Sequence, residues 1–120
     1  MSQASASRAI NSSEPLPSIS LQPGQYLLVQ QASGTTGSPL PTPDVTDLSP
    51  IAMSATAGKV TLVNSSTPLG CNGGSTPCSA AQLAQIVDLV GYDGANFFEG
   101  SAAAGTLSNT TAALRVANGC

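Results

Sequence analysis

The sequence contains no histidine and no tryptophan, and charged residues make up only 8% of its 120 residues. An average soluble domain contains about 25% charged residues. Histidine is the commonest general base, a frequent metal ligand and the ordinary pH switch near neutrality. Its absence therefore excludes zinc sites built from cysteine and histidine, and leaves no side chain of the usual kind to activate a serine hydroxyl.

Positive charge is equally scarce, because the only cations are Arg8, Lys59 and Arg115, against six acidic residues. Three scattered cations cannot form a basic patch, so we expect no direct nucleic-acid binding. No apolar run approaches the roughly 20 residues that span a membrane, so we expect no membrane span. The first 14 residues lack a basic start followed by an apolar core, and we expect no signal peptide there.

The chain is rich instead in small polar residues, with 12 glycines and 9 prolines, and 41% of its residues are hydrophobic. Aromatic residues account for only 3%, so a core must be built from small aliphatic side chains. This balance favours one all-β domain with many turns, and it also fits flexible secreted material. Little lysine and a close cysteine pair favour an extracellular location.

The segment 86–100 is predicted to organise the fold, since it holds three of the four aromatic residues. Its short β-branched apolar run, closed by Gly91, predicts a largely buried strand. Asp93-Gly94 then predicts a turn with a positive φ angle. Phe97 and Phe98 follow, and we expect the core to close around this corner because aromatic side chains bury the most surface.

Further strands are predicted at 26–31, with both faces apolar, and at 58–64, with Val60 and Leu62 pointing inward. Weaker patterns favour a brief strand or turn at 51–54 and a last strand at 112–116. Residues 1–19 have no apolar period, so we expect them to be irregular or disordered, and the domain to occupy 20–120.

Residues 32–50 form a long irregular passage in which three prolines alternate with other residues. Proline fixes φ and imposes an extended path, and a loop of this length is typically functional or crosses over a sheet. Leu40 and Val45 are predicted to anchor it to the core. A single helical turn is predicted at 79–85, behind the serine at its start.

Cys71 and Cys78 bound a small loop, and a disulfide between them is the natural interpretation in an oxidising compartment. On the loop-entropy model it would contribute about 2–3 kcal/mol. Metal binding by the two thiolates lacks further ligands nearby, and their spacing does not match the Cys-x-x-Cys redox motif.

Six segments in order resemble the lamin tail domain of secreted bacterial proteins, and together they cover about residues 20–117. They are Leu-Gln-Pro-Gly-Gln-Tyr-Leu-Leu-Val-Gln at 21–30, Pro-Leu-Pro-Thr-Pro-Asp at 39–44, Met-Ser-Ala-Thr-Ala-Gly-Lys-Val at 53–60, Ile-Val-Asp-Leu-Val-Gly-Tyr at 86–92, Asn96 with Phe-Glu-Gly at 98–100, and Ser-Asn-Thr-Thr-Ala-Ala-Leu-Arg at 108–115.

The resemblance implies an immunoglobulin-like β-sandwich that acts as a non-catalytic interaction module, often appended to extracellular endonuclease/exonuclease/phosphatase-type domains. The family's opening strands and its final segment have no match here, so the sandwich is expected to be incomplete and to self-associate through uncovered strand edges. Many relatives carry cysteine where this chain has Phe97, and that cysteine is expected to pair with the one matching Cys120. Cys120 is therefore expected to be a free or intermolecular thiol.

Asp88, Asp93 and Glu99 are the clustered acidic residues. A calcium site near Asp93 and Glu99 stays open, since carboxylates suit a hard cation, although the Asp-x-Asp-x-Asp-Gly pattern is absent. Turn chemistry and solvation are the favoured interpretation, and a catalytic carboxylate pair is disfavoured. The sequence also lacks a Gly-x-Ser-x-Gly elbow and a phosphate-binding loop.

These observations favour a non-catalytic accessory module of a secreted bacterial protein, with no cofactor and with a protein or other extracellular ligand as partner. We expect the contacts to lie on the 32–50 loop and the 92–100 corner. Two alternatives stay open. One is a fragment of an extracellular nuclease or phosphodiesterase whose catalytic domain lies outside this chain, and the other is a surface structural or adhesive module.

Overall fold

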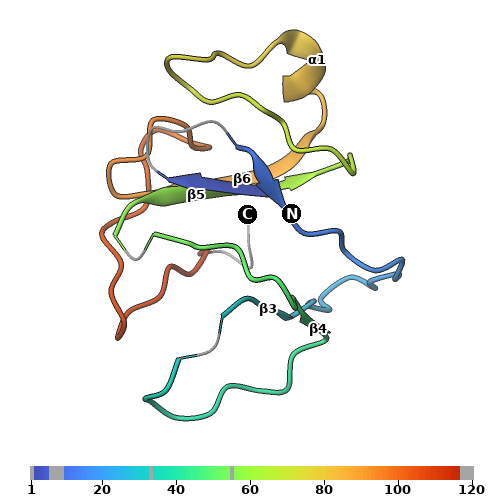
Figure 1. Cartoon of the computed structure of the whole chain (residues 1–120), viewed down its shortest axis with the longest axis vertical. Coiled ribbons are helices and arrows are strands. Elements are labelled where there is room, and N and C mark those ends of the chain that lie inside the picture. Colours follow the sequence, from blue (N-terminus) through green and yellow to red (C-terminus); the bar gives the residue numbers. More distant parts are fainter. Residues whose placement is uncertain (1, 6–9, 33, 55, 117–120) are drawn as a thin grey trace.

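The computed structural model describes residues 2–5, 10–32, 34–54 and 56–116 (Figure 1). The elements are β1 (Ser2–Ser5), β2 (Ser12–Ser13), β3 (Val29–Gln30), β4 (Val45–Thr46), β5 (Gly58–Val63), α1 (Ala80–Leu83) and β6 (Ile86–Tyr92). The described residues form strands joined by long loops and a single helix of four residues, which confirms the all-β class and the short helical turn.

The largest element is a four-stranded sheet in the order β2-β1-β5-β6, in which every neighbouring pair is antiparallel. The pairing of β5 with β6 is the longest, and its register shifts once, between Leu62 and Val63. Figure 1 shows this sheet at mid-height, between the loop that carries α1 and the chain that carries β3 and β4. The sheet therefore has a loop layer on each face.

The prediction that residues 1–19 are irregular is corrected by β1 and β2. β1 occupies an inner position, and its register pairs Ser2 with Thr61 and Ala4 with Lys59. A polar run such as Ser2–Ser5 carries no apolar alternation, so its pairing through backbone groups leaves no hydrophobic signal in the sequence. The domain boundary predicted after residue 19 therefore cuts through one sheet.

The strand predicted at 26–31 is reduced to β3, which pairs in parallel with β4 as a separate two-stranded sheet. Tyr26 is 87% exposed, so the apolar face expected there is open to solvent. Neither 51–54 nor 112–116 forms a strand. Strand propensity depends on a neighbouring strand, and the described residues offer none to 51–54 or 112–116, whereas 26–31 has a partner strand only at Val29–Gln30.

The inward face of β5 is opposite to the prediction. Lys59 and Thr61 are fully buried, whereas Leu62 is 40% exposed and Val60 is half-buried. Because side chains alternate along a strand, Lys59 and Thr61 share one face, and Leu89 and Gly91 of β6 lie opposite them. The more deeply covered face of this strand pair thus carries a lysine, a threonine and a glycine beside the buried Leu89.

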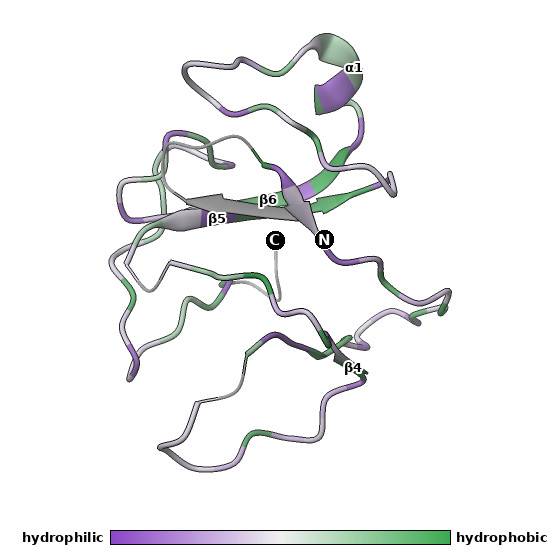
Figure 2. Cartoon of the chain, viewed as in Figure 1, coloured by the Kyte–Doolittle hydropathy of each residue, from purple (hydrophilic) through white to green (hydrophobic). Residues whose placement is uncertain are grey.

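The core is small and lies between the sheet and the disulfide loop. Ile10, Leu69 and Cys71 are its buried members, and the partly buried side chains packed against them are Val63, Cys78, Ile86 and Phe97. Phe97 and Phe98 are only half-buried, but Leu89, Tyr92 and Ala95 are buried, so the 86–100 segment supplies three of the six buried hydrophobic residues among those described. Figure 2 shows that hydrophobic residues also lie along the loops, away from the sheet.

Candidate functional site

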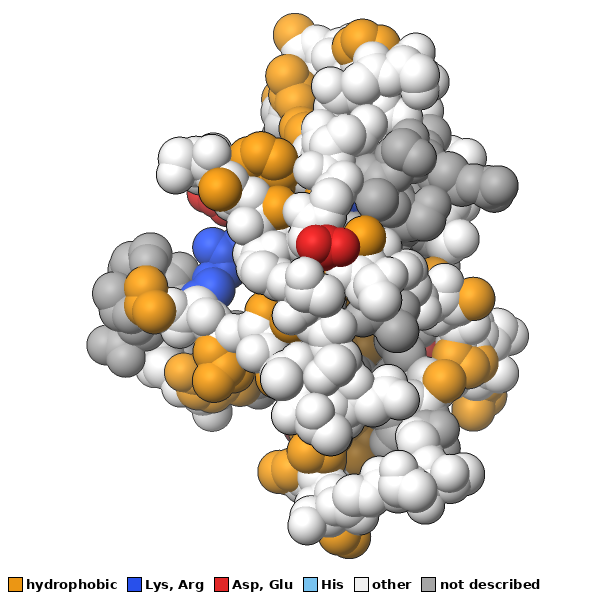
Figure 3. Space-filling view, turned by 90° about the vertical axis from the view of Figure 1, so that its left-hand side faces the viewer, with side chains coloured by type: hydrophobic (Ala, Val, Ile, Leu, Met, Phe, Trp, Pro, Cys, Tyr) orange, Lys and Arg blue, Asp and Glu red, His pale blue; other side chains and the backbone are white. Residues whose placement is uncertain are grey.

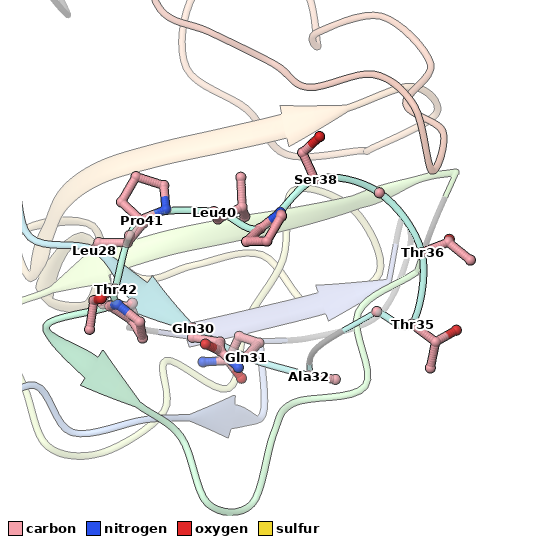
Figure 4. A pocket seen from close by; sticks show the side chains of 15 residues that line it. Leu28, Gln30, Gln31, Ala32, Thr35, Thr36, Ser38, Leu40, Pro41 and Thr42 are labelled. Atoms are coloured by element: carbon pink, nitrogen blue, oxygen red, sulfur yellow. The ribbon is translucent and has the colours of Figure 1, made fainter.

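The loop after β3 surrounds a hollow of about 630 Å³, lined by described residues between Leu28 and Pro43 (Figure 4). Leu28, Leu40 and three prolines are the large apolar residues of its lining, and the side chains of Thr35, Thr36, Ser38 and Leu40 point outward from the ring of chain in Figure 4. None of the described lining residues carries a charge. A hollow of this size lies within the range of ligand-binding pockets, about 300–1,000 Å³.

Backbone hydrogen bonds, rather than buried side chains, close the base of this loop. The Asp44 N–H donates to the Leu28 carbonyl at 2.9 Å, and the Leu28 N–H donates to Asp44 Oδ2 at 2.8 Å. The Asp47 N–H donates to the Gln30 carbonyl at 2.9 Å. Leu40 is 83% exposed, so the prediction that it anchors the loop to the core is wrong; Val45, half-buried in β4, lies at the loop's closed end.

A second group of residues meets on the covered face of the β5–β6 pair, around Lys59. Lys59 is fully buried, and its Nζ donates to Asn96 Oδ1 at 2.5 Å. Burial lowers the pKa of the Lys59 amine, because removing water disfavours its charged form. Both ion pairs among the described residues involve Arg115, so no described carboxylate compensates a charge on Lys59.

Gly91 makes the approach of Asn96 to Lys59 feasible. A Cβ atom built at Gly91 would lie 2.5 Å from the Phe97 carbonyl oxygen and 2.9 Å from the Ala95 Cβ. The chain after β6 therefore folds back directly over Gly91, which is the cross-strand partner of Lys59. The turn that reverses the chain has its positive φ at Asp93, 52°, rather than at Gly94, and closes through the Ala95 N–H donating to the Tyr92 carbonyl.

The disulfide loop covers this group from the other side. A Cβ at Gly73 would lie 2.0 Å from the Asn96 carbonyl oxygen, and a Cβ at Gly74 would lie 2.7 Å from Asn96 Nδ2. Two adjacent glycines thus leave room for Asn96. The sequence displays these glycines and Asn96, but it gave no signal that Lys59 is buried against them, since lysine is almost never fully buried.

Cys71 and Cys78 form a disulfide, as the sequence predicts. Asn72 organises the loop between them, because its Oδ1 accepts hydrogen bonds from the Gly74 N–H at 2.7 Å and the Thr76 N–H at 3.2 Å. Ser79 then caps α1 in a capping box with Gln82, whose Nε2 also donates to the Leu69 carbonyl. Cys120 lies outside the described residues, and its free thiol remains a prediction.

Arg115 brings two of the clustered acidic residues together, Asp88 and Glu99, whereas Asp93 has a different partner. Asp88 forms an ion pair with Arg115, and Glu99 lies 3.5 Å from the same guanidinium. Asp93 Oδ1 accepts a hydrogen bond from the Thr106 hydroxyl at 3.0 Å. The described residues contain no group of three or more His, Cys, Asp or Glu side chains arranged to hold a metal ion.

Arg115 and Asp88 also occupy the outer edge of β6. The Leu89 N–H donates to Asp88 Oδ1 at 2.8 Å, and Arg115 Nη2 lies 3.5 Å from the Leu89 carbonyl oxygen. Further along, Ala104 bridges this edge by donating to the Gly91 carbonyl and accepting from the Asp93 N–H. The outer edge of β6 and the turn after it are thus occupied at three residues, Leu89, Gly91 and Asp93.

The surface offers little charge for recognition. Figure 3 shows hydrophobic side chains scattered among uncharged polar groups, with charged side chains in few places. The two described cations are Lys59, which is buried, and Arg115, which is held by carboxylates. α1 has four residues, and no helix in the described part of the chain is long and apolar enough to cross a membrane.

No protein-family model matches the sequence, and neither a curated protein nor a solved structure matches the chain. The uncharged hollow at 28–43 and the Lys59–Asn96 contact are therefore interpreted from their own geometry.

Proposed function

We propose that this chain is a non-catalytic interaction module of a secreted protein, of the lamin tail type and with an incomplete immunoglobulin-like sandwich. A disulfide is typical of proteins from oxidising compartments, and it supports the extracellular location. The two sheets support the sandwich, with the four-stranded sheet as one layer and the β3–β4 pair as the start of the other.

The observation that carries the proposal is the hollow at 28–43. Its wall is uncharged, and it includes Leu28, which is 37% exposed, and Leu40, which is 83% exposed. Large apolar side chains kept in solvent next to a concave surface are a common mark of binding sites. Its base is fixed by the Asp44–Leu28 hydrogen bonds, so the surface is held in place before a partner arrives.

The partner recognised by such a wall is an uncharged, extended peptide segment. Prolines and leucines offer apolar contact, and the glutamine side chains that line the hollow, Gln30 and Gln31, offer hydrogen bonds. Because no described lining residue is charged, attraction between charges contributes little, and binding should persist at high salt.

A peptide array probed with the purified chain tests this function, with Leu40→Asp as the variant and Val87→Asp as the control. Val87 is 64% exposed on β6, so both substitutions place a carboxylate in solvent. The wild type and Val87→Asp should retain the same uncharged peptides at low and high salt, whereas Leu40→Asp should lose them. Equal retention by all three proteins, or no retained peptide, would refute this site. Phosphodiester hydrolysis by the chain would refute the non-catalytic assignment.

A further inference from the structure

The buried amine of Lys59 is an unusual feature for a fold with so few charges. A lysine removed from water is costly unless a carboxylate compensates it, and no described carboxylate lies within ion-pair distance of Lys59. Its hydrogen-bond partner is the side-chain amide of Asn96. An amine and a carboxamide in contact are the two reactants of amide exchange, and here the amine is buried while Asn96 is half-buried.

We propose that Lys59 and Asn96 join through an intramolecular amide bond between Lys59 Nζ and Asn96 Cγ, with release of ammonia. This covalent modification is separate from the binding function proposed for the 28–43 hollow, since none of the hollow's lining residues takes part in it.

The distance between the reacting atoms suits the reaction. Nζ lies 2.5 Å from Asn96 Oδ1, and a C=O bond is about 1.2 Å long, so Nζ lies within about 3.7 Å of Cγ. Reacting atoms in productive complexes lie about 3–3.5 Å apart. The backbone at Gly73 and Gly74 packs directly against Asn96, and the chain on either side of Asn96 packs on Gly91, so these contacts fix its position.

The chemistry balances without a cofactor or an oxidant. The neutral amine of Lys59 attacks Cγ, the new C–N bond forms, and the bond from Cγ to Nδ2 breaks. One amine proton moves to Nδ2, which leaves as ammonia, so two side chains become one amide plus one ammonia. Burial favours the neutral, nucleophilic form of the amine that this step requires.

The reaction is accelerated because the fold holds the two side chains next to each other. Well-oriented intramolecular reactions reach effective concentrations of about 10⁵–10⁸ M, and the two side chains are held together in the folded chain. Forming the amide also means that Lys59 can no longer carry a buried charge, because an amide nitrogen does not protonate as an amine does. The linkage would tie β5 to the corner after β6, next to the disulfide loop.

The mass of the intact, reduced wild-type chain tests the proposal. The expected mass is lower than the sequence mass by one ammonia, and in Asn96→Ala it equals the sequence mass of that variant. Cyclisation at Asn72-Gly73 or Asn118-Gly119 also releases ammonia, so the site of the loss must be located.

Trypsin locates it, because trypsin does not cleave after an acylated lysine. The unfolded wild-type chain, cut after Arg8 and Arg115, should yield residues 9–115 as one fragment, and its fragmentation spectrum should join Lys59 to Asn96. Asn96→Ala should yield 9–59 and 60–115. A wild-type chain of full mass, or one cleaved after Lys59 with the ammonia loss at an Asn-Gly pair, would overturn the proposal. The wild-type result alone tests the proposal, even if the Asn96→Ala variant does not fold.

Discussion

Gly91 lies directly across the β5–β6 pair from Lys59, and its missing side chain lets Asn96 reach the lysine amine. The packing on the covered face of the sheet therefore depends on the lack of a side chain at Gly91. A residue of any size at position 91 would collide with the returning chain at Phe97 and Ala95.

Gly91→Ala should destabilise the fold by about 1–3 kcal/mol, because the added methyl group overpacks the corner. Gly94→Ala is the matched control, since a Cβ there meets nothing within 4 Å, and it should change the free energy of unfolding by less than about 0.5 kcal/mol. Urea denaturation followed by circular dichroism measures both. Equal stabilities for the two variants would show that the corner does not pack on Gly91.

Ile10→Ala should cost about 2–5 kcal/mol of stability, because Ile10 is fully buried against Leu69 and Cys71. The control is Ile19→Ala, whose side chain is 50% exposed and which should cost far less. Thermal unfolding of the two variants under identical conditions compares them. An Ile10→Ala protein as stable as Ile19→Ala would restore the prediction of an irregular N-terminal segment.

Tyr92 should make the fold sensitive to alkaline pH. Burial raises the pKa of its hydroxyl, which donates to the Ser54 carbonyl at 2.6 Å. The unfolded state then loses the proton more readily than the folded state. The contribution of Tyr92 to the free energy of unfolding is complete below the ordinary tyrosine pKa of about 10. It is lost as pH rises through the raised pKa of the folded state. Tyr92→Phe should lessen this alkaline loss, and Tyr26→Phe, at an exposed position, should leave it unchanged. Identical profiles of unfolding free energy against pH for wild type and Tyr92→Phe would contradict this role.

Arg115→Gln should expose the outer edge of β6 to other chains. The ion pair with Asp88 lies at the surface, so its loss should lower stability by less than about 1 kcal/mol. Unpaired strand edges promote association, and the variant should therefore form more dimer or aggregate than the wild type. Glu99→Gln, which leaves the Asp88 pair intact, is the control. Sedimentation at several concentrations compares the association of the two variants. If Arg115→Gln stays as monomeric as the wild type, the Arg115 side chain does not protect the edge.

The sequence was sufficient for features whose signal is local. Strands β5 and β6 follow from apolar β-branched runs, α1 from a serine cap, and the disulfide from two nearby cysteines. The sequence did not predict features that depend on contacts between residues distant in the chain. β1 is a polar run held by backbone pairing to β5, and Lys59 is buried because a glycine opposite it and a turn after β6 bring Asn96 over it.

The candidate sites divide in the same way. The loop at 32–50 could be singled out from its prolines and its length, and the hollow lies there. The Lys59–Asn96 contact could not be foreseen, since alternation placed Val60 and Leu62 inward instead. Alternation fixes which residues share a face, but the covering loops decide which face is buried.

The central structural claim is that β1 lies inside the sheet between β2 and β5. Nuclear Overhauser effects measured on the isotope-labelled full chain test it most directly. Cross-strand contacts are expected between Ser2 and Thr61 and between Ala4 and Lys59, with slow amide exchange along β5. Random-coil chemical shifts for residues 2–5, with no contact to β5, would contradict it.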